Sequence, residues 1–147
     1  SKRFGFAGHS AINQARLAYA AFQKTFSGPR WDALAQAGAS VQRPLWASTS
    51  TKNPTYPDTM YVDQLIGPDT VNTLPDATLE AFAERGTVAR TIDVNIGVSR
   101  RQWAELATNA IDVDEVAAQL EAEGVASFIK SFDELIGVLE DKAAGIT

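Results

Sequence analysis

The sequence predicts an α/β fold in which parallel strands alternate with helices. Short apolar runs at residues 43–48 and 70–73 have the length of strands and are bounded by turn residues. Each run is followed, after a short polar connection, by apolar residues at helical spacing. A strand–helix–strand–helix order with short connections predicts parallel strands joined by right-handed crossovers. With 45% hydrophobic and 21% charged residues, the composition is that of an ordinary globular protein, and the length of 147 residues suits one modest domain.

The bulk composition excludes several classes of function. The formal net charge of −5 argues against a general nucleic-acid binder, which needs a basic face. The absence of cysteine excludes disulfides and thiolate metal sites, and His9 is the only histidine, so a histidine cluster is excluded as well. There is no apolar run of the ~20 residues that span a bilayer, and the first residues do not resemble a signal peptide. We therefore expect a cytoplasmic protein that binds no metal and no membrane.

The first helix is predicted from Ser10, a plausible N-cap, to the Ser27–Pro29 stretch. Its apolar residues recur at steps of three and four, as in one helical face: Ile12, Ala15, Tyr19, Phe22 and Phe26. A second helix is predicted over residues 31–36. The buried strand at 43–48 follows, with Pro44 at its start because proline has no N–H for a ladder.

The middle of the chain predicts a second strand–helix unit. A helix capped by Asp58 stops at Gly67. The short strand at 70–73 comes next, and then a helix from Asp76 to just before Gly86.

The remainder is predicted to be helical. The stretches Ser99–Gln102 and Asp112–Glu115 resemble capping boxes, and the helix after the second is expected to end at Gly124. A last helix, residues 125–142, has apolar residues on one face: Phe128, Phe132, Leu135 and Leu139. Because a two-stranded parallel sheet is marginal by itself, we expect these strands to belong to a larger sheet.

The polar stretch Ser48–Asn53 lies at the carboxyl end of the first strand, where α/β proteins bind ligands. Its hydroxyls and the Lys52 ammonium suit a phosphate, because hydrogen bonds to charged groups are strong. An ordinary solvated turn is the alternative interpretation. Lys52 could also attack a carbonyl as a free amine if it lay in a desolvated pocket. No GxxxxGK[ST] motif is present, so a P-loop is not supported.

Residues 43–82, which contain LWASTSTKNP and YVDQLIGPDTVNTLP, closely resemble the C-terminal part of transaldolases of the long bacterial type. The segments on either side also resemble the family, though more loosely. The resemblance therefore covers residues 11–147 and leaves residues 1–10 unmatched. It implies an eight-stranded α/β barrel of the TIM type, of which the chain holds strands seven (45–48) and eight (70–73) with their helices and the C-terminal helices. One of Leu45 and Trp46 would then face the barrel interior and the other its helices, because side chains alternate along a strand.

The family's Schiff-base lysine and its acid/base partners come from strands that this chain lacks, so the resemblance implies no catalytic residue here. The family's seventh strand ends in a serine followed two positions later by a basic residue, and these hold the substrate phosphate. Ser50 and Lys52 match that pattern, with Ser48 as an alternative for the serine. Asn72 and Thr73, on the eighth strand, would line the site or form hydrogen bonds in the barrel core.

The implied activity is the transfer of a dihydroxyacetone unit from sedoheptulose 7-phosphate or fructose 6-phosphate to an aldose phosphate, in the pentose phosphate pathway. It needs no cofactor. The expected partners are sugar phosphates and the remainder of the barrel polypeptide, and the chain by itself is expected to be inactive. Two alternatives stay open: the transaldolase part of a bifunctional transaldolase/glucose-6-phosphate isomerase, and a non-catalytic barrel fragment.

Overall fold

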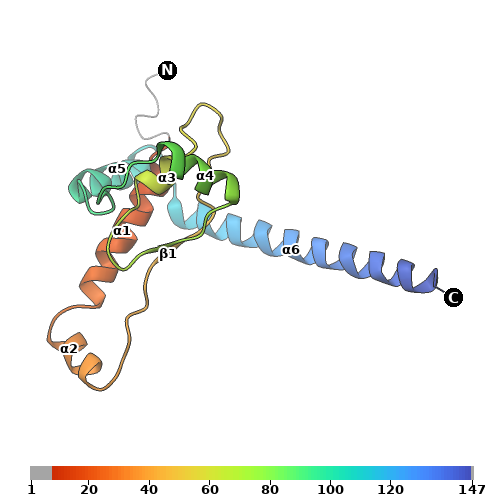
Figure 1. The fold of residues 1–147 in the computed structure, drawn as a ribbon, viewed down its shortest axis with the longest axis horizontal. Helices are drawn as coiled ribbons and strands as arrows, with labels where there is room; N and C mark the ends of the chain where they lie inside the picture. Colours follow the sequence, from red (N-terminus) through yellow and green to blue (C-terminus); the bar gives the residue numbers. More distant parts are fainter. Residues whose placement is uncertain (1–7, 147) are drawn as a thin grey trace. The chain divides into compact units, whose positions relative to one another are not determined.

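The chain divides into two compact units, Ser1–Ala104 and Glu105–Thr147. The computed structural model describes residues 8–146. The first unit contains the elements before α5, in this order: α1 (Ser10–Thr25), α2 (Pro29–Gln36), β1 (Leu45–Trp46), α3 (Met60–Asp63), β2 (Val71–Asn72) and α4 (Asp76–Arg85) (Figure 1). Helix α5 (Ile96–Thr108) runs from the first unit into the second, which also contains α6 (Val113–Ala144).

The two strands pair in parallel, as predicted, with Leu45 opposite Val71 and Trp46 opposite Asn72. Each strand is two residues long, so the predicted ranges 43–48 and 70–73 were too long. The prediction of a buried strand was also wrong, since Leu45 is 53% exposed. Both differences have one cause: each described strand has a single neighbour, which leaves an edge and a face uncovered.

The core of the first unit forms under the predicted face of α1. Ile12 and Tyr19 are buried together with Leu65 and Ile92, and Trp46 packs against this cluster. The Tyr19 hydroxyl donates a hydrogen bond to the carbonyl oxygen of Pro68 at 3.0 Å, and burial raises the pKa of Tyr19. The loop after α3 is thereby fastened to the first helix.

Three predicted caps are corrected by the structure. Ser10 is the first helical residue of α1, and the N-cap position belongs to His9. Asp58 does not cap α3, because its carboxylate accepts a hydrogen bond from Arg85 of α4. Ser99 lies inside α5, fully buried, and its hydroxyl has no hydrogen-bond partner among the described residues. Sequence spacing cannot distinguish a capping side chain from one inside the helix when contacts with other elements decide where the helix begins.

In the second unit, the predicted cap at Asp112 is confirmed. Its carboxylate accepts hydrogen bonds from the backbone N–H groups of Asp114 (3.0 Å) and Glu115 (3.2 Å). The helix that follows is a single one of 32 residues, drawn without interruption in Figure 1, so the predicted stop at Gly124 was wrong. A glycine in a helix interior costs only about 1 kcal/mol relative to alanine, which the good helix formers around it can offset.

No helix within residues 8–146 is long and apolar enough to cross a membrane.

Candidate functional site

The candidate site is built on the loop that leaves β1. Ser48 has a left-handed backbone (φ 56°) and turns the chain out of the strand direction. The next residue, Thr49, is buried, and its hydroxyl donates to the Asn72 side-chain oxygen at 2.9 Å and to the Thr73 carbonyl at 3.2 Å. The start of the loop is therefore fastened to the end of β2.

A turn at residues 53–56 holds the other end of this loop. The side-chain oxygen of Asn53 accepts hydrogen bonds from the backbone N–H (3.0 Å) and the hydroxyl (2.8 Å) of Thr55. The backbone N–H of Tyr56 donates to the Asn53 carbonyl at 3.1 Å. This is the local side-chain bonding expected of asparagine in a turn. Residues 50–52 thus stand between two anchored points.

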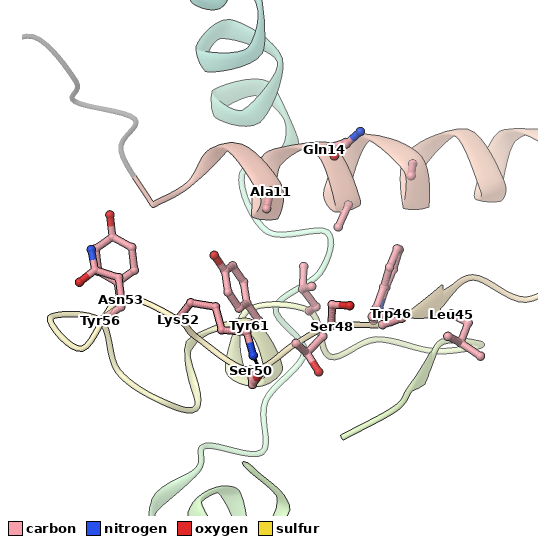
Figure 2. Close-up of a pocket in the computed structure, with 15 residues that line it drawn as sticks. Ala11, Gln14, Leu45, Trp46, Ser48, Ser50, Lys52, Asn53, Tyr56 and Tyr61 are labelled. Carbon is pink, nitrogen blue, oxygen red and sulfur yellow. Dashed lines mark hydrogen bonds between the residues drawn. The ribbon is translucent and has the colours of Figure 1, made fainter. Parts of the chain in front are cut away.

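Lys52 and Ser50 meet on this segment. The Lys52 ammonium donates a hydrogen bond to the Ser50 hydroxyl at 3.0 Å, and Figure 2 shows the two side chains turned toward each other. Lys52 is exposed and Ser50 is half-buried. The exposed setting lacks the desolvation that a free-amine nucleophile would need. A cation and a hydroxyl at this distance can together donate to an anion.

These residues line one cavity of about 730 Å³ in the first unit. The loop forms one wall, with Ser48, Ser50 and Lys52, and α1 forms the opposite wall (Figure 2). The Trp46 side chain points toward α1 and the Leu45 side chain points away, in the alternation expected of a strand. No Asp or Glu occurs among the described residues that line this cavity, so the Lys52 charge faces no carboxylate there.

The wall formed by α1 was not predicted from the sequence. It consists mainly of small side chains, with Ala11, Ala15 and Ala18 at helical spacing next to the longer Gln14. The spacing of these alanines was a usable signal, because small residues on one helical face allow close approach. Asn72 and Thr73 are not among the residues that line the cavity. Both accept hydrogen bonds from the Thr49 hydroxyl and so hold Thr49 in place.

Within residues 8–146, no group of three or more acidic or histidine side chains is arranged to hold a metal ion.

Comparison with known proteins identifies the family. A sequence model described as Transaldolase/Fructose-6-phosphate aldolase matches residues 3–139. The chain belongs to this family. The resemblance to transaldolases seen in residues 43–82 is thereby confirmed.

Bacterial transaldolases are similar to this chain over most of its length. The transaldolase of Frankia alni is 51% identical over 131 residues, which are 88% of this chain and 35% of that protein. The transaldolase of Parafrankia sp. is 52% identical over 134 residues, 90% of this chain and 36% of that protein. That of Trichodesmium erythraeum is 46% identical over 142 residues, 95% of this chain and 37% of that protein. The chain therefore spans little more than a third of the length of these transaldolases.

Proposed function

We propose that this chain is the part of a transaldolase barrel that contains strands seven and eight and the loop that binds the substrate phosphate. The parallel pairing of β1 with β2 supports the barrel assignment, because parallel strands joined by helical connections are the unit from which such barrels are built. The family match and the partial coverage of the relatives support the same assignment.

In this proposal, the Lys52 ammonium and the Ser50 hydroxyl hold the phosphate of the sugar. Ser48, on the same wall of the cavity, is the alternative hydroxyl. Holding the non-reacting phosphate fixes the sugar carbonyl in position for attack, which lowers the entropic cost of the reaction. The observation that carries the proposal is the Lys52–Ser50 pair at the carboxyl end of β1, with no carboxylate opposite it among the described lining residues.

The reaction proposed for the complete protein is transfer of a dihydroxyacetone unit between sugar phosphates through a lysine Schiff base, in the cytoplasm. The Schiff-base lysine would come from the part of the barrel that this chain lacks. The chain by itself should therefore bind weakly and turn over no substrate.

A chimera tests the assignment of Lys52. The segment of the Frankia alni transaldolase that matches this chain is replaced by the corresponding residues of this chain, and Lys52→Ala is introduced. A charge-assisted hydrogen bond contributes roughly 1.5–3 kcal/mol, so KM for fructose 6-phosphate should rise about ten- to a hundredfold with a smaller change in kcat. Steady-state kinetics measures both constants.

Lys24→Ala removes an equally charged, exposed side chain at the end of α1 and is the matched control. Its KM should equal that of the parent chimera. If Lys52→Ala leaves KM within twofold of the control, Lys52 does not hold the phosphate.

The two serines can be separated in the same chimera. Ser50→Ala should raise KM several-fold, because the hydroxyl that accepts from Lys52 would no longer be there to contact the phosphate. Ser48→Ala should leave KM nearly unchanged. The opposite ranking would assign the phosphate contact to Ser48.

A non-catalytic fragment is the second candidate, and the partial coverage of the relatives favours it. Borohydride reduction of the isolated chain in the presence of fructose 6-phosphate should give no covalent label under either candidate, because both place the Schiff-base lysine outside this chain. Covalent labelling of the isolated chain would show a reactive lysine within it and would contradict the proposed division of roles.

A further inference from the structure

Arg16 and Ser99 each hold a buried polar atom that has no hydrogen-bond partner among the described residues. These atoms are Nε of Arg16, on α1, and Oγ of Ser99, on the part of α5 that belongs to the first unit. Ser99 is only 1% exposed. Burying a donor without an acceptor costs free energy, so buried polar groups in proteins generally contact a protein group, a water or an ion.

The two side chains come from facing turns of antiparallel helices. The Asn13 side chain, near the start of α1, donates a hydrogen bond to the Gln102 side chain of α5 at 2.9 Å. Further along α1, Tyr19 is buried in one cluster with Ile92, which comes just before α5. α5 therefore runs antiparallel to this part of α1. The residues one turn later on α1 and one turn earlier on α5 face each other, and they are Arg16 and Ser99.

The Arg16 guanidinium has no negative partner among the described residues. Its Nη2 donates to the neutral side-chain oxygen of Gln64 at 2.9 Å, and it forms no ion pair. Burial lowers the pKa of Arg16, and no carboxylate lies near enough to raise it. A guanidinium nevertheless stays charged at neutral pH. A partly buried positive charge is therefore left without compensation between α1, α3 and α5.

Hydrogen-bond donors outnumber acceptors in this group. The side-chain oxygens of Gln64 and Gln102 already accept hydrogen bonds. The Arg16 Nε–H and the Ser99 hydroxyl remain as donors. A water would bring two hydrogens that need acceptors of their own, whereas an anion only accepts. The charge and the hydrogen-bond balance thus both favour an anion over a water.

The burial of the two atoms limits the size of the ligand. Arg16 Nε and Ser99 Oγ are both enclosed by the packed helices. A sugar phosphate, or a carboxylate from another polypeptide segment, would have to separate α1 from α5 to reach them. A monatomic anion can instead be enclosed as the helices pack.

We propose that Arg16 and Ser99 bind a small monovalent anion, with chloride as the example that a cell supplies. The anion joins α1 to α5 and neutralises the guanidinium that also holds Gln64 of α3. It thereby stabilises the helix that forms one wall of the candidate cavity. The site is structural, is separate from the Lys52 loop and does not depend on the proposed function.

Chloride-dependent stability tests the proposal on the 147-residue chain. Urea unfolding is followed by tryptophan fluorescence while sodium chloride replaces sodium gluconate, up to about 0.3 M at constant ionic strength, so that charge screening stays the same. An ion that binds only the folded state raises the folded-to-unfolded ratio by the factor 1 + [L]/Kd. That ratio should rise on the order of tenfold in the parent chain.

Ser99→Ala removes one donor of the site and should reduce this rise to about twofold or less. In gluconate it should leave the stability unchanged or raise it, because a buried hydroxyl without a partner is lost. Arg16→Gln removes the charge and should abolish the response, and Ser99→Ala keeps the test valid if Arg16→Gln does not fold. Ser27→Ala removes an exposed hydroxyl after α1 and is the matched control, which should respond to chloride as the parent does. Equal responses of the parent and Ser99→Ala would overturn the proposal.

Bromide locates the ion directly, because it replaces chloride and scatters X-rays anomalously. Crystals of the chain grown in sodium bromide should show an anomalous peak within hydrogen-bond distance of Arg16 Nε and Ser99 Oγ. A water at that position without an anomalous signal would contradict the assignment. So would a Ser99 hydroxyl that donates to a backbone carbonyl, or bromide peaks at exposed side chains alone.

Discussion

At the scale of single residues, Thr49 fastens the loop of the candidate site to the neighbouring strand end. It is buried at 3% exposure, and its hydroxyl joins the loop after β1 to Asn72 and Thr73 of the neighbouring strand end. Lys52 and Ser50 follow directly on this anchored point. The positions of Lys52 and Ser50 therefore depend on the hydrogen bond from Thr49 to Asn72.

Replacing Thr49 by valine should destabilise the first unit by about 1–3 kcal/mol, because the half-buried Asn72 side-chain oxygen would lose its donor. The free energy of unfolding is measured by urea titration with tryptophan fluorescence. Thr25→Val, at the exposed end of α1, is the control and should change it by less than about 0.5 kcal/mol. A loss at Thr49 no larger than that of the control would show that the bond to Asn72 does not stabilise the loop.

At the scale of elements, local patterns located the helices well and their ends less well. The helical spacing in α1 and the Asp76–Gly86 segment gave nearly the observed bounds. The ends failed where tertiary contacts took over a cap, as Arg85 does at Asp58, or where a glycine did not stop a helix, as in α6. A cap depends on one or two hydrogen bonds, so a single competing neighbour is enough to change it.

Asp112 is an N-cap that sequence spacing predicted and the structure confirms, so its contribution can be measured. Asp112→Ala should cost about 1 kcal/mol, because two backbone N–H groups of the first turn of α6 lose their acceptor. Hydrogen exchange at the amides of residues 114–115 should become correspondingly faster. Asp114→Ala removes the same charge from the same turn without removing the cap, and it should show a smaller increase. Equal increases would assign the effect to charge at the helix start.

At the scale of the whole chain, surface ion pairs link the stability of the first unit to pH. The hydrogen bond from Arg85 lowers the pKa of Asp58, and the hydrogen bond from Arg90 lowers the pKa of Asp93. A carboxylate whose pKa is lowered in the folded state contributes stability above its unfolded pKa of about 3.9. That contribution is lost as the pH falls through the lower folded pKa. Because Asp58 and Arg85 are both about half exposed, the effect should be small and sensitive to salt.

Asp58→Asn/Asp93→Asn should flatten the acid side of the stability profile below about pH 4 and leave its shape at higher pH nearly unchanged. Urea unfolding midpoints between pH 2 and pH 6 measure this profile. Asp133→Asn/Asp141→Asn removes two exposed carboxylates of α6 and is the charge-matched control. If both double variants flatten the profile equally, net charge rather than the two ion pairs sets the acid limit.

The candidate site was predictable in its residues and not in its shape. Ser48, Ser50 and Lys52 stood out because hydroxyls and a cation follow a strand directly, and the structure brings all three to one cavity. The opposite wall comes from α1, more than twenty residues earlier in the chain. A pattern along the sequence does not record which helix will lie across from a loop, because that is decided by packing.

The sequence by itself determined the family, the order of helices and strands, the parallel pairing and the polar loop after the first strand. These follow from local spacing and from residue types, which act over a few neighbours in the chain. The tertiary structure alone decided which caps form, that α6 continues through Gly124, and that the faces of Leu45 and Phe128 are exposed. Burial and capping depend on groups brought from distant positions, so they become visible only once the elements are packed together.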